Sequence, residues 1–115
     1  MNDIDVLKAM ARTFAEERDW KQFHTPKDIV MDIAIETGEL MEHFIWREGE
    51  EAEEYIKANK EDIEDELSDV LHGVVLLADV LDIDIMTSFE KKMRKNEKKY
   101  PIEKARGKNI KHTKL

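Results

Sequence analysis

The chain has 115 residues, 41% of them hydrophobic and 40% charged, with a net charge of −8, which is typical of a single folded domain and not of a disordered chain. The lack of cysteine excludes disulfides, thiol catalysis and zinc–thiolate sites, and the lack of an apolar run of about 18 residues argues against a membrane span. Residues 1–90 hold 8 Lys and Arg against 25 Asp and Glu, and such an acidic body disfavours nucleic acid binding.

The first predicted helix covers residues 3–19. Asn2 or Asp3 can cap its N-terminus, because short polar side chains accept hydrogen bonds from the free N–H groups there. The apolar stripe of this helix, at helical spacing, consists of Ile4, Leu7, Met10 or Ala11, and Phe14. One face of the helix is therefore expected to pack against the rest of the chain.

A second helix is predicted over residues 26–46, after the loop DWKQFHTP. Thr25 is its candidate N-cap, and Asp28 completes a weak capping box. Glu36 and Glu39 lie on the same stripe as several of its apolar residues. If this stripe faces another helix, the two acids must be neutralised, because an unpaired buried charge is costly.

A third main helix is predicted over residues 61–81, after a polar, acid-rich connector at 47–60 that can contain a short helix at 51–58. It is apolar on almost every side after Val70, which predicts that it is buried. Its earlier turns nevertheless carry Glu66 and Asp69, which are three residues apart and therefore share one face. That face continues into the apolar part of the helix, so both carboxylates are expected to point toward the core.

The fourth main helix is predicted over residues 85–99 and ends before Tyr100-Pro101. Together the four helices predict an all-α bundle over residues 1–100. Residues 101–115 form a basic tail, irregular or docked on a neighbouring subunit. The basic end of the chain can hold phosphates, or it can neutralise an acidic body. Because the N-terminus lacks the features of a secretory signal, a cytoplasmic protein is expected.

Two helices thus each present a pair of acids three residues apart. If the helices pack antiparallel, four carboxylates converge, from Glu36, Glu39, Glu66 and Asp69. An oxygen-only ligand set suits a hard divalent cation, Mg²⁺ with Mn²⁺ as a substitute, and such ions usually bind substrate phosphates as well. Either pair alone is more typical of a solvated helix face, but the two together predict a metal site for phosphate chemistry.

Gly38 and Gly73 lie inside helices, where Gly costs about 1 kcal/mol relative to Ala. Each leaves room beside an acid pair, either for a ligand or for close helix packing. Aromatic rings flank the second helix and form either a lid on the core or a stacking slot for a nucleobase. These residues are Trp20, Phe23, His24 and Trp46. His43 and His72 are near the acid pairs by spacing, and are expected to support the site or lie on the surface.

Assembled, these segments resemble the MazG-like superfamily of all-α nucleoside triphosphate pyrophosphohydrolases, and within it the dCTP pyrophosphatase branch. The similarity runs from about Leu7 to the C-terminus. It rests on FAEERDWKQFHTPKDI at 14–29, ETGEL at 36–40, FIW at 44–46, ELSDVL at 66–71, KMRKNEKKYP at 92–101 and the ending KHTKL.

The resemblance implies a helical bundle that assembles as a dimer or a dimer of dimers. It also implies hydrolysis of a nucleoside triphosphate, dCTP or a modified pyrimidine deoxynucleotide, to monophosphate and pyrophosphate in nucleotide-pool house-cleaning. The residues that would hold Mg²⁺ and act in catalysis are Glu36, Glu39, Glu66 and Asp69. Those that would line the base pocket are Trp20, Phe23, His24 and Trp46. Those that would contact phosphate or sugar are Lys92, Asn96 and Tyr100.

The chain departs from the dCTP branch at two positions near the expected base or sugar. That branch has a His where this chain has Ala11 and a Tyr where it has Gly73. Both changes remove bulk and a hydrogen-bonding group. We therefore expect Gly73 to border a base pocket that accepts a wider or modified base or has looser selectivity for the base, while the metal site is unchanged.

Two other functions are compatible with the residues. A helical module could bind a nucleotide or a protein without hydrolysing anything, with its acids merely solvated. A di-iron carboxylate bundle is the other alternative, because His72 follows Asp69 by three residues, a spacing related to the Glu-x-x-His of such bundles. The second helix lacks this spacing, which favours an oxygen-only site.

Overall fold

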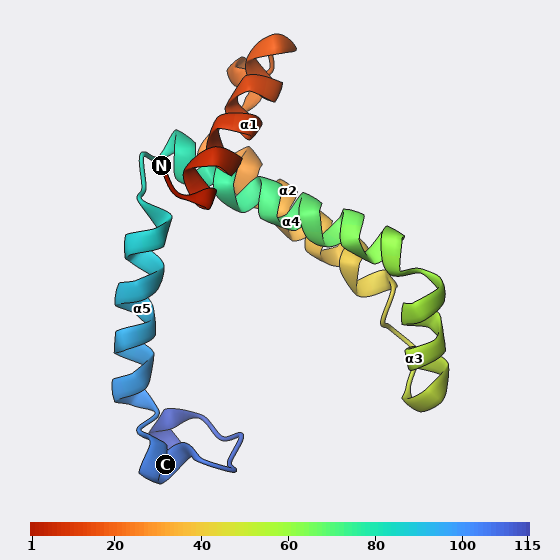
Figure 1. Ribbon diagram of the computed structural model, residues 1–115, viewed down its shortest axis with the longest axis vertical. Helices are drawn as coiled ribbons and strands as arrows, with labels where there is room; N and C mark the ends of the chain where they lie inside the picture. Colours follow the sequence, from red (N-terminus) through yellow and green to blue (C-terminus); the bar gives the residue numbers. More distant parts are fainter. The chain divides into compact units, whose positions relative to one another are not determined.

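The computed structural model describes all 115 residues and is entirely helical (Figure 1). The α-helices are α1 (Asp3–Glu17), α2 (Pro26–Glu42), α3 (Gly49–Ala58), α4 (Lys60–Val80), α5 (Ile85–Lys99) and α6 (Ile102–Ala105). Two 3₁₀ helices cover Lys21–Phe23 and His112–Lys114. The predicted all-α class is confirmed, and none of the helices has the length and apolarity that a membrane crossing requires.

The chain divides into two compact units, residues 1–83 and residues 84–115. The first contains α1 to α4, and the second contains α5, α6 and the C-terminal 3₁₀ helix. The predicted division of the protein into residues 1–100 and a tail at 101–115 stays a prediction.

Polar side chains fix where α1 and α2 begin. The side chain of Asn2 accepts a hydrogen bond from the N–H of Asp5 at 2.9 Å, and Asp5 accepts one in return from the N–H of Asn2 at 3.3 Å. Thr25 caps α2 in the same way by accepting from the N–H of Asp28 at 3.2 Å. Asp28 does not complete the predicted capping box, because the N–H of Thr25 already donates to the carbonyl of Phe23.

Helix α2 ends at Glu42, four residues earlier than predicted. The N–H groups of His43 and Phe44 donate to carbonyls only three residues back, which tightens the last turn. Trp46 then adopts a left-handed backbone conformation with φ 68°. The aromatic segment that continues the helical spacing therefore lies in a turn, and Trp46 is 89% exposed.

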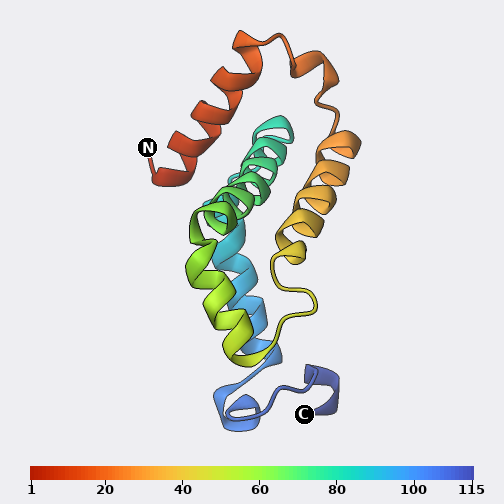
Figure 2. The same ribbon diagram turned by 90° about the vertical axis from the view of Figure 1, so that its right-hand side faces the viewer.

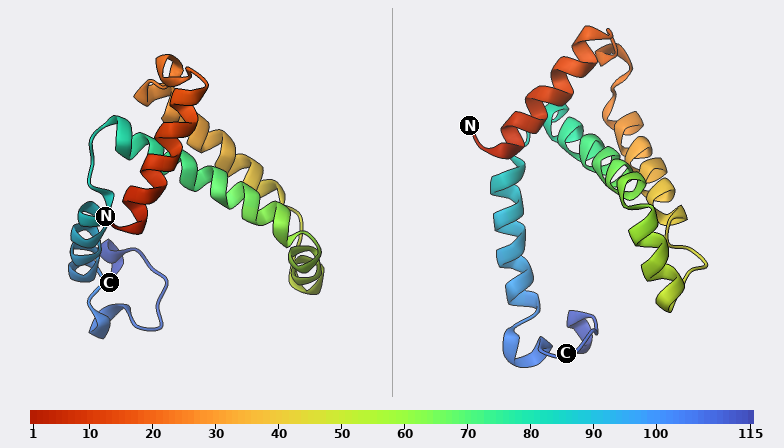
Figure 3. Two further views of the ribbon diagram at one scale, coloured as in Figure 1. Left: turned by 45° about the horizontal axis from the view of Figure 1, so that its top comes forward. Right: turned by 45° about the vertical axis from the view of Figure 1, so that its right-hand side comes forward.

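The core of the first unit lies where α1, α2 and α4 meet. Helices α2 and α4 run antiparallel and side by side (Figure 2), and α1 crosses α4 (Figure 3). The buried cluster consists of Ala11, Ile29, Val75 and Leu76, with Leu7, Ile33 and Leu77 packed against it. The Nε and Nη2 atoms of Arg12 each donate to one carboxylate oxygen of Asp79, which ties α1 to α4 at the edge of this core.

Helix α4 is buried on fewer sides than its composition predicts. Gly73, Val75, Leu76 and Ala78 are buried. Leu71, by contrast, is 43% exposed and Leu81 is 47% exposed. The main neighbours of α4 are α1 and α2, and they leave these two side chains partly uncovered. The chain therefore carries apolar surface on α4 that its own core does not use.

Candidate active site and metal centre

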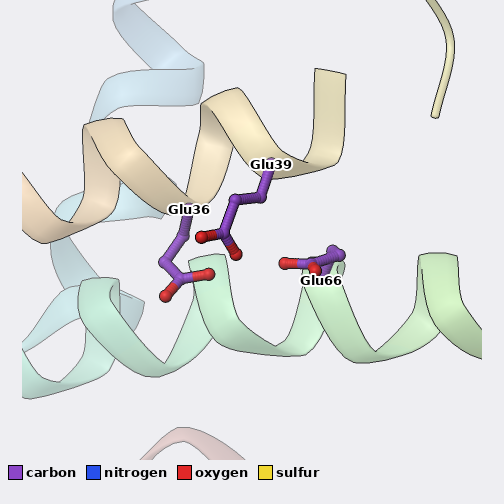
Figure 4. A group of neighbouring side chains, drawn as sticks. All are labelled: Glu36, Glu39 and Glu66. Atoms are coloured by element: carbon purple, nitrogen blue, oxygen red, sulfur yellow. The ribbon is translucent and has the colours of Figure 1, made fainter. Parts of the chain in front are cut away.

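Three carboxylates converge between α2 and α4. Glu36 and Glu39 project from α2 and Glu66 projects from α4, and one oxygen of each lies within 4.8 Å of the others (Figure 4). The antiparallel packing of the two helices brings these turns opposite each other. The predicted meeting of acids from two helices is therefore seen for these three residues.

The polar atoms of this cluster are incompletely paired. One carboxylate oxygen of Glu36 and one of Glu66 are shielded from solvent and have no hydrogen-bond partner. An unpaired oxygen out of water is costly, and a bound cation would remove that cost. The cluster offers only oxygen atoms, the ligands preferred by Mg²⁺ and Mn²⁺. The residues present therefore fit a hard divalent cation.

The proximity of these acids raises their affinity for protons. The pKa of Glu36 is raised to about 7, first because burial removes water from its carboxylate, and then through a hydrogen bond with Glu39 and the negative charges of Glu39, Asp69 and Asp32. The pKa of Glu66 is raised by burial and by Glu39 and Asp69, while His43 opposes the shift. Such concentrated negative charge favours binding of a cation.

Asp69 lies outside the group of three. Its charge reaches Glu36 and Glu66, but its side chain is exposed and lines a neighbouring cavity together with Ala11 and Met10 of α1. The acid pair of α4 is therefore divided between two directions, with Glu66 toward α2 and Asp69 toward the side of α1. The role of Asp69 as a fourth ligand stays a prediction.

His43 and Tyr55 lie at the α3 end of this cluster. The Nδ1 atom of His43 and the hydroxyl of Tyr55 are 2.9 Å apart, and the guanidinium of Arg47 lies 3.6 Å from the centre of the Tyr55 ring. No histidine belongs to the carboxylate group itself. The site therefore lacks the mixed carboxylate and histidine ligands of a di-iron bundle.

A cavity of about 310 Å³ lies between α1, α2 and α4, toward the N-terminal end of α2. It is lined by Phe14, Trp20, His24, Asp28, Ile29, Asp32, His72, Gly73 and Leu76. Of the predicted base-pocket residues, Trp20, His24 and Gly73 border it. Phe23 and Trp46 do not border it, and they are 62% and 89% exposed.

Six residues of this cavity were not predicted as site residues, and four of them, Phe14, His72, Asp28 and Asp32, carry aromatic or polar groups. The rings of Trp20, Phe14 and His72 form a continuous wall, with centroid separations of 5.6 Å and 5.9 Å in edge-to-face contacts. Asp28 and Asp32 form the acidic side. The signal for these acids was available, since they precede Glu36 by two turns and one turn on the same helical stripe.

The predicted phosphate-contacting residues are in the second unit. Lys92 and Asn96 are one turn apart on α5, and Tyr100 follows the end of that helix, where its N–H donates to the carbonyl of Asn96 at 2.9 Å. The Tyr100 ring makes an edge-to-face contact with His112 at 5.6 Å. Their role toward a ligand stays a prediction.

Comparison with known proteins places the chain in a family. Residues 31–115 match the MazG-like family. The chain belongs to the MazG-like family. It is 33% identical to dCTP pyrophosphatase 1 of Bos taurus, over 97% of this chain and 68% of the relative. It is 34% identical to dCTP pyrophosphatase 1 of Homo sapiens, over 97% of this chain and 67% of the relative.

A solved structure agrees with these relatives. A pyrophosphatase from Archaeoglobus fulgidus is similar with a TM-score of 0.81 and 36% identity, over 88% of this chain and 94% of that chain. The relatives and the solved structure are all pyrophosphatases, and this MazG-like chain is a hydrolase of that class. The resemblance predicted from the sequence is confirmed.

The two departures from the dCTP branch lie in different places in the MazG-like protein. Ala11 is buried in the core and also borders the cavity of about 430 Å³ that Asp69 lines. Gly73 borders the aromatic cavity, where a Cβ atom would lie 2.6 Å from Cγ1 of Ile33. A side chain at this position would therefore require Ile33 to move or α4 to move away from α2. Gly38, in contrast, has no such neighbour within 4 Å.

The raised pKa of Glu36 predicts a pH dependence for the metal-free MazG-like protein. The pKa of Glu36 is about 7 in the folded protein and 4.5 ordinarily, so the folded protein binds the proton more tightly than the unfolded chain. The resulting contribution to stability is fully present below pH 4.5 and is lost as pH rises through about 7. Glu66 shifts in the same direction. We expect urea unfolding in EDTA to show lower stability at about pH 8 than at about pH 5.5, and Mg²⁺ to restore it.

The Glu36→Gln variant is the control for this dependence, because it lacks the titrating group. Its unfolding free energy in EDTA should vary less over the same pH range. Asp79 does not interfere, since the Arg12 guanidinium lowers its pKa from 3.8, outside the range tested. An equal pH dependence in the wild type and the variant would contradict the prediction.

Proposed function

We propose that the protein hydrolyses nucleoside triphosphates to nucleoside monophosphates and pyrophosphate with Mg²⁺ as its cofactor, and that dCTP or a modified pyrimidine deoxynucleotide is the preferred substrate. The observation that carries this proposal is the meeting of Glu36, Glu39 and Glu66, with two unpaired oxygens, beside an aromatic cavity. The names of the relatives support the nucleotide as substrate.

Each carboxylate has a part in this proposal. Glu36 and Glu66 would hold the metal through their unpaired oxygens, with Asp69 completing the set. Mg²⁺, when bound, neutralises charge on the triphosphate and makes water more acidic. Glu36 or Glu39 accepts the proton of the attacking water. The water oxygen bonds to the α-phosphorus, and the bond to the bridging oxygen breaks so that pyrophosphate leaves.

The remaining predicted residues complete the binding of substrate in this proposal. The base stacks on the ring wall of Trp20, Phe14 and His72, because aromatic faces provide large contact area for planar bases. Lys92 and Asn96 contact the phosphates or sugar, since the ammonium group is a strong donor to phosphate oxygens. Neither contact changes the covalent chemistry, so both act on binding and orientation.

Oligomer formation and a cytoplasmic location belong to the same proposal. Apolar side chains on α2 lie exposed, including Val30 at 51%, Met31 at 53% and Ile35 at 58%. Exposed apolar stripes of this kind usually mark protein contacts. A dimer or a dimer of dimers would cover them. The acidic first 90 residues support the proposal that no nucleic acid is bound.

The direct test is pyrophosphate release from a panel of canonical and modified ribo- and deoxynucleoside triphosphates. With Mg²⁺ we expect turnover of at least one pyrimidine deoxynucleotide, with release of one monophosphate and one pyrophosphate. Treatment with EDTA should abolish the turnover, because the carboxylates alone repel the anionic substrate. Addition of Mg²⁺ or Mn²⁺ should restore it.

The alternative, a helical module that binds a nucleotide or a protein without hydrolysis, gives a different result in the same panel. Calorimetry would then show nucleotide binding that does not depend on Mg²⁺, with no pyrophosphate from any member. That outcome would overturn the hydrolytic proposal.

A further inference from the structure

Two aspartates face the aromatic cavity without a partner. Asp28 and Asp32 both line it, and neither carboxylate has a hydrogen bond or an ion pair within the chain. Asp28 is free because Thr25 caps the helix alone, through its hydroxyl. Since helix capping does not occupy these carboxylates, they are available to a ligand in the cavity.

The position of these acids relative to the carboxylate cluster suits a nucleoside. Asp32 and Asp28 precede Glu36 by four and eight residues on α2, which places them about 6 Å and about 12 Å away along the helix axis. A nucleotide whose phosphates lie at the cluster would therefore extend its sugar and base along α2 into the cavity. The two acids would then face the base and not the phosphates.

The polar groups of the cavity differ in whether they can donate or accept a hydrogen bond. The imidazoles of His24 and His72 can donate or accept a hydrogen bond, depending on the tautomer. The Nδ1 atom of His24 is shielded from solvent and has no partner. Ionised Asp28 and Asp32 can only accept. They are therefore groups on the cavity wall that can only accept, in contrast to the indole N–H of Trp20, which can only donate. The two carboxylates favour ligands that present N–H donors.

Nucleobases differ in the donors that they present. Cytosine and adenine carry an exocyclic amino group, whereas uracil, thymine and hypoxanthine carry a carbonyl oxygen at the corresponding position. An amino group donates to a carboxylate in a charge-assisted hydrogen bond. A carbonyl oxygen in the same place would put two acceptors against each other and leave both unpaired, which disfavours binding.

We propose that Asp28 and Asp32 are specificity-determining residues that select nucleotides whose base carries an exocyclic amino group over the matched bases with a carbonyl. The inference rests on the proposed function for the location of the base, and it names the class of substrate. It covers cytosine and adenine, the bases whose amino group takes the place of the carbonyl oxygen of uracil, thymine and hypoxanthine.

The test compares matched pairs that differ only at this group. We expect kcat/KM to be about 10- to 100-fold higher for dCTP than for dUTP, because the carbonyl-bearing base cannot donate a hydrogen bond to the carboxylate. The same difference is expected for 5-methyl-dCTP over dTTP and for dATP over dITP. In Asp28→Asn or Asp32→Asn the amide can also donate, so the ratio should fall about tenfold or more.

Two controls make the result specific to the cavity. Asp62→Asn removes a charge from the first turn of α4, away from the cavity, and should leave the dCTP to dUTP ratio unchanged. Circular dichroism verifies that each variant folds, and if one aspartate variant does not fold, the other tests the proposal. Unchanged ratios in the folded variants would overturn the assignment.

A binding measurement separates this inference from the proposed function. Calorimetry with the monophosphates dCMP and dUMP needs no hydrolysis, and tighter binding of dCMP that is lost in the aspartate variants supports the inference. Equal kcat/KM within every pair would overturn the inference and leave the hydrolysis intact. No turnover of any triphosphate, together with preferential binding of dCMP, would overturn the hydrolytic function and support the selection of amino groups.

Discussion

Replacing Glu66 by Gln should lower the rate of pyrophosphate release by about 10²–10⁴-fold, as for the loss of several kcal/mol of transition-state stabilisation from a metal site. Glu66 is the contribution of α4 to the three-carboxylate group, and one of its oxygens has no partner. A glutamine keeps the shape but loses the negative charge and one of the two oxygens. The metal and the triphosphate would then be held less tightly.

The same variant should become more stable in the absence of metal. The raised pKa of Glu66 comes from burial and from the neighbouring Glu39 and Asp69, so removing its charge relieves repulsion in the folded protein. Loss of activity with unchanged or higher stability distinguishes a functional group from a structural one.

The measurement combines a pyrophosphate assay with urea unfolding and circular dichroism. Glu64→Gln is the matched control, because Glu64 is exposed on the same helix and outside the carboxylate group. It should keep the rate and the helical content of the wild type. A wild-type rate in Glu66→Gln would remove this residue from the site.

Replacing Gly73 by Ala should lower both stability and activity. The added Cβ would lie 2.6 Å from Cγ1 of Ile33, so the two helices must separate or Ile33 must move. Ile33 is one turn before Glu36 on α2, and a shift of about 1 Å at a catalytic group can cost about 100-fold in rate. We therefore expect pyrophosphate release to fall about 10- to 100-fold.

Gly38→Ala is the matched control for this substitution. Both glycines are inside helices, and alanine should gain about 1 kcal/mol of helix propensity at either. Apart from its chain neighbours and the backbone of its own helix, no atom lies within 4 Å of a Cβ at Gly38. Only Gly73→Ala therefore carries the cost of overpacking. In urea unfolding, Gly73→Ala should be about 1–3 kcal/mol less stable than Gly38→Ala.

A second substitution tests whether Ile33 is the cause. Ile33→Ala removes the atom that the new Cβ would meet, so the double variant with Gly73→Ala should lose less stability than the two single variants together. Additive losses, or equal stability of Gly73→Ala and Gly38→Ala, would show that the approach of α4 to α2 does not depend on the glycine.

The helices could be predicted from the chain because their signals are local. The helices were predicted from their apolar spacing. Asn2 and Thr25 predicted the observed starts of α1 and α2, and Pro101 predicted the observed end of α5. The paired acids at spacing three also predicted that Glu36, Glu39 and Glu66 would meet, because both pairs lie on stripes that must face a neighbour.

The division of the α4 acid pair, with Glu66 in the carboxylate group and Asp69 in a neighbouring cavity, depended on packing. Spacing places Glu66 and Asp69 on one face of α4, but a helical face is wider than the contact with one neighbour. The angle at which α1 and α2 reach α4 sends Glu66 toward α2 and leaves Asp69 beside Ala11. The angle between the helices cannot be predicted from sequence spacing alone.

The residues that line the aromatic cavity could also be predicted only in part from the sequence. Trp20 and His24 could be predicted from their place before α2, whereas the exposure of Trp46 follows from the early end of that helix and its left-handed turn. Asp28 was predicted only as part of a capping box, whereas Gly73 was expected at the base pocket from the family resemblance. Local sequence therefore determined the helices, their caps and the acid stripe. The crossing of the helices decided which side chains share a cavity, because contacts between segments distant in the chain depend on their relative rotation and not on local spacing.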